Sequence, residues 1–152
     1  MTMEQATTLD VADRLDILDL YSRYALLFDT GQAAAWADLF TPDGTFFIVS
    51  GPTLYGTAEL RAFAERRHQD TPGIRHLVSN VVLEPAGDGA HGSAYVVVLG
   101  GVDDGLPTEI LTLGGYDDRL RKTESGWRFA ARTYCAWTNG AGANGRLFGV
   151  TL

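Results

Sequence analysis

The sequence predicts an α+β fold in which helices cover one face of a curved antiparallel sheet. Apolar residues recur at helical spacing over residues 10–28, whereas four strand-like segments follow in series after residue 73. Helices therefore come first and an antiparallel meander comes last, which is typical of an α+β layout. We expect a pocket between the sheet and the long first helix, with its mouth where that helix ends.

The first half of the chain is predicted to be mainly helical. The helix over 10–28 begins after Asp10, a good N-cap, and ends before Gly31, a good C-terminal stop. A short helix over 32–40, a turn at 41–44, a strand at 45–49 and a loop at 50–56 follow. Thr57 is expected to cap a third helix that reaches about His68.

Four strands account for most of the second half, at 74–84, 90–100, 108–121 and 126–137. The breaks between them, PAGDG, GGVDDGLP and KTESG, are rich in turn residues. Since no linker or internal repeat appears, we interpret residues 1–152 as one domain with its core over 10–137. The Gly-rich segment 138–152 is predicted to be a flexible tail whose apolar end, including Phe148, folds over the pocket mouth.

Composition excludes several classes of function. The net charge of −7 repels phosphate backbones and anionic lipid, so we expect neither nucleic-acid nor membrane partners. No signal peptide and no run of 18 apolar residues is present, which favours a cytoplasmic protein. The single cysteine, Cys135, forms no internal disulfide, and no metal-type Cys/His spacing, P-loop, dinucleotide fingerprint or nucleophile elbow appears.

An unusual histidine lies in the strand GIRHLVSN. By alternation His76, Val78 and Asn80 share one strand face, so an imidazole and an amide lie where apolar side chains are usual. Asp29 ends the first helix, where the macrodipole disfavours a carboxylate unless a nearby group such as an imidazole favours it. An Asp–His pair is a working general base. The alternative is a core histidine and an ordinary turn aspartate, because spacing alone does not join the two residues.

Other side chains are candidates for contact with a substrate. Tyr21 and Tyr24 lie three residues apart on the same side of the first helix. Asn80, Tyr116 and Arg132 are further candidates on the predicted strands, together with Phe148 in the tail. His91 follows a Gly-rich turn and is more typical of a surface position.

Four stretches together resemble the SnoaL-like group of the nuclear transport factor 2-like superfamily. They are DILDLYSRYALLFDTGQ, AWADLFTPDGTF, GIRHLVSN and GGYDDRLRKTESGWRFAARTY. The resemblance implies a cone-shaped α+β barrel with a central pocket, and a homo-oligomer, either a trimer or a dimer. It covers most of residues 10–137, and it is more specific for the superfamily than for one activity.

Within this group the chain looks most like the branch of scytalone dehydratase, bile-acid dehydratase and hexachlorocyclohexane dehydrochlorinase. Those enzymes use an Asp–His dyad, and Asp29 and His76 match its two places. Tyr24 matches a tyrosine of bile-acid dehydratase five residues before the aspartate, where the dehydrochlorinase has a lysine. Scytalone dehydratase has a second histidine, to which His91 corresponds only loosely.

The sequence therefore predicts a lyase that removes water from a small, apolar, cyclic hydroxy-ketone of polyketide or steroid type. His76, held by Asp29, would take a proton next to a carbonyl, and Tyr24 would polarise that carbonyl or protonate the leaving hydroxyl. No metal or other cofactor is expected, since the carbonyl makes the proton acidic enough for an imidazole. Two alternatives stay open: a polyketide cyclase or isomerase with the same dyad, and a non-catalytic protein that binds small molecules.

Overall fold

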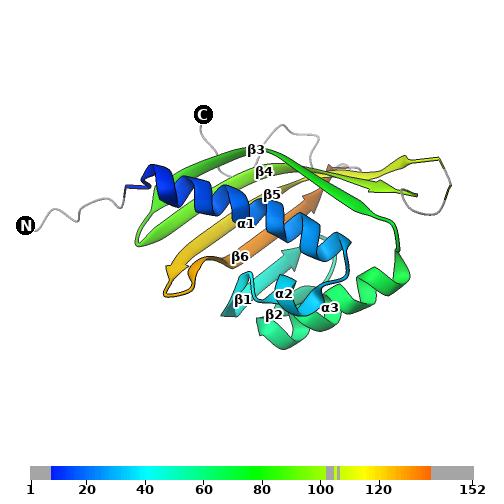
Figure 1. Cartoon of the computed structure of the whole chain (residues 1–152), viewed down its shortest axis with the longest axis horizontal. Helices are drawn as coiled ribbons and strands as arrows, with labels where there is room; N and C mark the ends of the chain where they lie inside the picture. Colours follow the sequence, from blue (N-terminus) through cyan, green and yellow to red (C-terminus); the bar gives the residue numbers. More distant parts are fainter. Residues whose placement is uncertain (1–7, 102–104, 106, 138–152) are drawn as a thin grey trace, which may run out of the picture.

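The computed structural model describes residues 8–101, 105 and 107–137, and it confirms the α+β fold (Figure 1). The chain forms three helices and six strands within this part. In chain order they are α1 (Val11–Asp29), α2 (Ala33–Ala37), β1 (Phe40–Ile48), β2 (Thr53–Tyr55), α3 (Gly56–Asp70), β3 (Arg75–Ala86), β4 (Gly89–Gly100), β5 (Glu109–Thr123) and β6 (Gly126–Ala136).

The strands form one open sheet in the order β2-β1-β6-β5-β4-β3. Neighbouring strands are antiparallel except β1 and β6, which pair in parallel, so the sheet is mixed rather than wholly antiparallel. Figure 1 shows α1 lying across one face of the sheet, with α2 and α3 beside β1 and β2. The resemblance implied a cone-shaped barrel. In the structure this barrel is open: it is a curved sheet whose edge strands, β2 and β3, do not pair with each other.

The predicted boundaries of the four long strands lie within two residues of the observed ones. The differences gather around β1. The TPDG segment at 41–44, predicted as a turn, lies inside β1, where the pairing with β6 shifts register between Phe40 and Thr45. Residues of the predicted loop pair with β1 as β2. The predicted Thr57 cap is wrong, because α3 begins at Gly56 and the Glu59 carboxylate accepts from the Tyr55 N–H at 2.8 Å.

The core lies between α1 and the inner face of the sheet. Asp10 caps α1 as predicted, since its carboxylate accepts from the Asp13 N–H at 2.8 Å. The buried face of α1 repeats every three or four residues and carries the aromatic side chains, whereas the stripe of Val11, Leu15 and Leu18 is exposed. The Tyr24 ring contacts the rings of Trp36, Phe40, Tyr116 and Phe129.

Asp13 joins the start of α1 to the β5–β6 hairpin. Its Oδ1 accepts from Lys122 Nζ at 2.7 Å and from Trp127 Nε1 at 2.9 Å. The pKa of Asp13 is lowered, chiefly by the hydrogen bond from Lys122 and then by that from Trp127. We call these two hydrogen bonds to the Asp13 carboxylate the Asp13 clip. They hold the N-terminal end of α1 against the β5–β6 hairpin, so that the C-terminal end of α1, at Asp29, has a defined place over the sheet.

Candidate active site

The structure brings Asp29 and His76 together. Asp29 is the last residue of α1, and His76 is the second residue of β3. The His76 ring donates through Nδ1 to Asp29 Oδ1 at 2.6 Å, and the His76 backbone N–H donates to Oδ2 at 2.7 Å. Both carboxylate oxygens are therefore satisfied, which offsets the unfavourable position of this charge at a helix C-terminus.

This geometry orients the imidazole. The Asp29 side chain is 4% exposed and lies behind the ring, whereas the His76 side chain is 13% exposed and reaches a cavity. An ionised carboxylate only accepts hydrogen bonds, so Nδ1 carries the proton and Nε2 keeps a free lone pair. The His76 and Phe28 rings also pack against each other in a T-shaped arrangement, with ring centroids 5.3 Å apart. The arrangement can take a proton at Nε2 and stabilise the resulting imidazolium.

A cavity of about 450 Å³ adjoins the imidazole, between α1, α3 and the inner face of the sheet. Most of its lining is apolar, which strengthens each polar contact made inside it. The polar lining consists of His76, three tyrosine hydroxyls, one threonine hydroxyl and one arginine. The lining residues are Tyr24, Phe28, Phe46, Ile48, Pro52, Phe63, Arg67, Ile74, His76, Val98, Leu111, Thr112, Tyr116 and Tyr134.

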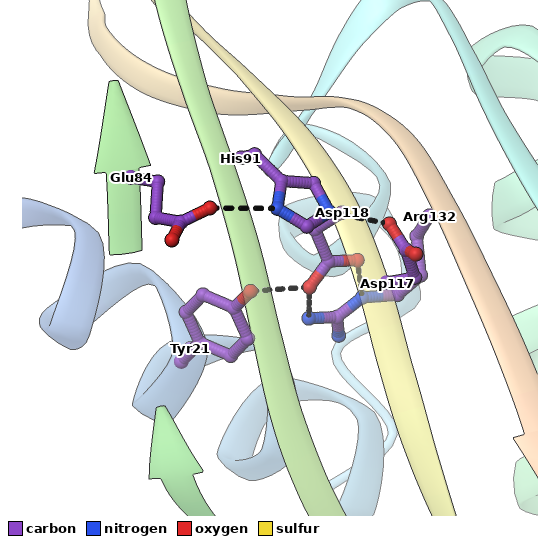
Figure 2. Close-up of polar contacts among 6 residues, drawn as sticks. All are labelled: Tyr21, Glu84, His91, Asp117, Asp118 and Arg132. Atoms are coloured by element: carbon purple, nitrogen blue, oxygen red, sulfur yellow. Dashed lines mark hydrogen bonds and ion pairs between the residues drawn. The ribbon is translucent and has the colours of Figure 1, made fainter. Parts of the chain in front are cut away.

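A fully buried ion pair, drawn in Figure 2, lies against two tyrosines of the cavity lining. Arg132 on β6 and Asp118 on β5 face each other in the sheet register and are both 0% exposed. Arg132 Nε and Nη2 donate to the two Asp118 oxygens at 2.7 and 2.8 Å, and the Tyr21 hydroxyl donates to the same carboxylate. Burial is the largest single influence on the pKa of Arg132 and lowers it, but the charge and hydrogen bonds of Asp118 together with the nearby tyrosines outweigh burial, so the pKa is raised.

The residue opposite Asp118 on β4 is Gly92. A Cβ at this position would collide with the Tyr21 hydroxyl. Glycine thus leaves the space through which Tyr21 on α1 reaches the carboxylate on β5.

The Arg132 guanidinium packs against the rings of two tyrosines that line the cavity. Its Cζ lies 4.0 Å from the ring centre of Tyr24 and 3.8 Å from that of Tyr116. Burial raises the pKa of Tyr24 to about 12 although Arg132 lowers it, and burial raises the pKa of Tyr116 well above its usual value. Both phenols therefore stay protonated near neutral pH and can donate hydrogen bonds. Arg132 Nη1 is buried with no hydrogen-bond partner in the described part of the chain.

The predicted site residues divide into three groups. Tyr24, Tyr116 and His76 line the cavity, with Asp29 directly behind His76. Tyr21 and Arg132 do not line it, because both are buried in the network with Asp118. Phe148 and the rest of the segment 138–152 lie outside the described residues.

Asn80 does not share the face of His76. The pairing of β3 with β4 shifts between Ser79 and Val82, and Asn80 has a positive φ of 55°. One extra residue in the strand reverses the alternation, so Asn80 is exposed while Val81 packs against the core. Strict period-2 reading of GIRHLVSN therefore placed this side chain on the wrong face.

His91 belongs to a separate cluster. Its Nε2 lies 2.8 Å from an Asp117 oxygen, and its Nδ1 lies 4.0 Å from a Glu84 oxygen (Figure 2). Asp117 and Asp118 are successive residues of β5, so their side chains point to opposite faces of the sheet. His91 therefore faces away from the cavity and cannot contact a molecule bound there.

Three polar lining residues were missed at the level of sequence: Arg67, Thr112 and Tyr134. Thr112 Oγ1 and the Tyr134 hydroxyl lie 3.2 Å apart. Tyr134 follows Arg132 by two residues, so strand alternation would have found it once the inner face of β6 was known. Arg67 follows Phe63 by four residues, which places it on the same face of α3.

The described residues contain no group of three or more histidine, cysteine, aspartate or glutamate side chains able to hold a metal ion. None of the helices in this part of the chain has the length and apolar character needed to cross a bilayer.

Comparison with known proteins assigns the family. The model of the SnoaL-like domain matches residues 10–133. The chain belongs to the SnoaL-like family. This confirms the resemblance of the four sequence stretches. No match was found among curated proteins.

Solved structures agree with this assignment. An NTF2-like protein with a cystatin-like fold from Novosphingobium aromaticivorans is 26% identical, with a TM-score of 0.79, over 91% of this chain and 90% of that one. A variant of Rv3472, a protein of unknown function from Mycobacterium tuberculosis, is 32% identical, with a TM-score of 0.74, over 86% and 78% of the two chains. A structure from N. aromaticivorans with the provisional name scytalone dehydratase is 19% identical, with a TM-score of 0.73, over 83% and 85%. At that identity the likeness is one of fold.

Proposed function

We propose that the protein is a cofactor-independent dehydratase acting on a small, largely apolar, cyclic β-hydroxy-ketone. The observation that carries the proposal is the Asp29–His76 pair at the wall of an apolar cavity, with Tyr24 in the same lining. A base, a hydrogen-bond donor and a water-poor enclosure are what removal of a proton next to a carbonyl requires. The SnoaL-like group that the sequence resembles also includes dehydratases and cyclases.

In the proposed reaction, His76 Nε2 takes a proton from the carbon next to the substrate carbonyl. The electron pair of that C–H bond moves toward the carbonyl oxygen and forms an enolate, while Asp29 stabilises the imidazolium. The Tyr24 O–H donates to the enolate oxygen, and the charge of Arg132 beneath the ring favours the same negative oxygen.

Water then leaves from the neighbouring carbon. The enolate re-forms the carbonyl, a carbon–carbon double bond forms, and the C–O bond of the hydroxyl breaks. The leaving hydroxyl takes the proton that His76 removed, so the enzyme returns to its starting state and the products are an unsaturated ketone and water. The roles of Tyr116 and Tyr134 in this scheme are to shape the cavity and to donate hydrogen bonds to the substrate.

A polyketide cyclase or isomerase is the second candidate, because the same base and the same phenols would stabilise an enolate that attacks another carbonyl or moves a double bond. Product mass distinguishes the two, since dehydration lowers it by about 18 Da and isomerisation keeps it unchanged. The third candidate is a protein that only binds such molecules, in which case changing the dyad would leave its ligand affinity intact.

The experiment is a mass-spectrometric assay of a panel of hydroxylated cyclic ketones with the wild type, Asp29→Asn and His76→Gln. We expect either substitution to lower the rate by about 10²–10⁴, the contribution of a general base. Asp16→Asn, a substitution of an exposed aspartate on α1, is the matched control and should keep the wild-type rate. Equal rates for His76→Gln and the wild type would rule out the proposed base.

A further inference from the structure

Arg67 is the one permanently charged side chain among the described residues that line the cavity. No aspartate or glutamate in the described part of the chain lines it, because Asp29 lies behind His76. The other polar lining groups are phenols, a threonine hydroxyl and the imidazole. The reaction proposed above uses the imidazole and the phenols, and it assigns no role to Arg67.

Arg67 is on the inner side of α3. Leu60 and Ala64 on this helix are buried, Phe63 lines the cavity, and Arg67 follows Phe63 by one turn. The carbonyl of Arg67 accepts from the Thr71 N–H at 3.0 Å and from the Thr71 hydroxyl at 2.8 Å. The end of the helix is thereby fixed, and with it the direction from which the arginine meets the cavity.

The guanidinium of Arg67 has no partner in the described part of the chain. By contrast, Arg61 on the same helix pairs with Glu65 at 2.8 Å. A basic residue in the last turn of a helix is favoured by the macrodipole alone, so its presence needs a second observation before it indicates a ligand. That observation is its place in the cavity lining, which the neighbouring Arg66 does not share.

The burial of each lining side chain shows how deep in the cavity it lies. Tyr24 and Tyr116 are buried at the inner end, His76 is partly covered, and Arg67 is exposed, so it lies at the mouth. A substrate whose carbonyl meets the phenols at the inner end presents its opposite end to Arg67. The planar guanidinium offers two parallel N–H groups, which match a carboxylate. In a chain of net charge −7, this local cation is what offsets the long-range repulsion of an anion.

We propose that the substrate is a cyclic ketone carrying a carboxylate at the end remote from the reacting carbonyl, and that Arg67 binds that carboxylate at the cavity mouth. The inference rests on the proposed function, because the dehydratase reaction sets which end of the substrate lies deep. It narrows the substrate class from cyclic hydroxy-ketones in general to those that also carry a carboxylate.

The test uses phenols as stable mimics of the enol, each as a free acid and as its methyl ester. The probes are 6-hydroxy-2-naphthoate and a series of (4-hydroxyphenyl)alkanoates in which the chain between ring and carboxylate grows from one to three carbons. Binding is measured by isothermal titration calorimetry with the wild type, Arg67→Met and the neighbouring Arg66→Met, each checked for an unchanged melting temperature.

We expect the wild type to bind the best-matched acid at least about tenfold more tightly than its ester, the effect of one charge-assisted contact at a partly exposed site. Arg67→Met should remove the preference for the acid while leaving the affinity for the ester within about twofold of the wild type. Arg66→Met should keep the full preference for the acid, and Arg67→Lys should keep part of that preference. Added salt should weaken the acid and not the ester.

The outcomes separate this inference from the function on which it rests. Equal affinity for acid and ester across the series, or a preference that survives Arg67→Met, would overturn the role of Arg67 while the dehydratase proposal stands. Ester binding that is lost in Tyr24→Phe places the probe in the cavity. If no acid or ester binds at all, or if ester binding is unchanged by Tyr24→Phe and His76→Gln, the cavity is not the substrate site and both proposals fail.

Discussion

At the scale of single residues, Arg132 and Asp118 form an ion pair in which neither side chain is exposed to water. Two charges removed from water stabilise a fold only while they compensate each other. Arg132→Met keeps much of the side-chain volume but leaves Asp118 buried and uncompensated, with the Tyr21 hydroxyl as its remaining partner. We expect this substitution to lower the free energy of unfolding by about 3–5 kcal/mol, measured by urea denaturation.

The double variant Arg132→Met with Asp118→Leu is the control for that result. It removes both charges, so we expect it to recover much of the lost stability, because two well-packed apolar side chains can replace a buried pair with little cost. If the double variant were less stable than Arg132→Met alone, the loss would come from packing around Tyr24 and Tyr116 rather than from the uncompensated carboxylate.

The sequence predicted residue types better than side-chain directions. Asp29, His76 and Tyr24 matched the family pattern, and the structure places Tyr24 and His76 in the lining of one cavity with Asp29 directly behind His76. Arg132 was identified as a candidate, but strand alternation does not say which of the two faces of the strand points toward the core. Its ion pair with Asp118 depends on the register between β5 and β6, which no local pattern encodes.

At the scale of elements, the bulge in β3 is the feature that alternation could not reveal. Asn80 adopts a φ of 55°, a region that asparagine and glycine tolerate and β-branched residues do not. We expect Asn80→Val to lower the free energy of unfolding by about 1–2 kcal/mol and Asn80→Gly to change it by less than about 1 kcal/mol, both measured by urea denaturation. A stabilising Asn80→Val would contradict the left-handed conformation.

The Asp13 clip gives a prediction with a defined dependence on pH. Its pKa is lowered in the folded state by Lys122 and Trp127, so its stabilising effect is present above the unfolded value of 3.8 and is lost as pH falls through the folded pKa. Asp13→Asn should therefore melt at a lower temperature than the wild type at pH 7, and the difference should narrow on acidification below about pH 4. Asp16→Asn, exposed on the same helix, should melt like the wild type at both pH values.

The helices and long strands were predictable because their signals are local: the Asp10 cap, the spacing of apolar residues and the turn-rich breaks. The irregular start of β1 was not, because TPDG has the composition of a turn and becomes strand only through pairing with β6, about 90 residues later in the chain. A parallel pair between the first and last strands is a property of the whole sheet.

At the scale of the whole molecule, α1 lies across one face of a single sheet (Figure 1). The apolar core, the Arg132–Asp118 pair and Asp29 at the end of α1 all lie on that side of the sheet. The family membership accounts for this arrangement, but it does not determine assembly. The homo-oligomer implied by the resemblance stays a prediction, and the molar mass in solution, measured by light scattering, decides between monomer, dimer and trimer.

The three buried tyrosines between α1 and the sheet make the stability of the whole fold sensitive to alkaline pH. The pKa of Tyr24 is raised to about 12, and burial raises the pKa of Tyr21 and Tyr116 well above 10.0. In the unfolded chain these phenols ionise near pH 10, so between the unfolded and folded values the unfolded state releases protons that the folded state keeps. The free energy of unfolding should then fall as pH rises above 10, by up to about 1.4 kcal/mol per pH unit for each tyrosine.

Urea midpoints at pH 8, 10 and 11, read by fluorescence, measure this slope. Replacing Tyr24 with phenylalanine removes one of the three phenols and should make the loss between pH 10 and 11 about one third smaller. Tyr55→Phe, a change of an exposed tyrosine, should leave the slope unchanged. A wild-type midpoint that stays constant from pH 8 to 11 would mean that these phenols ionise as readily in the folded state as in the unfolded state, and the raised pKa of Tyr24 would then be wrong.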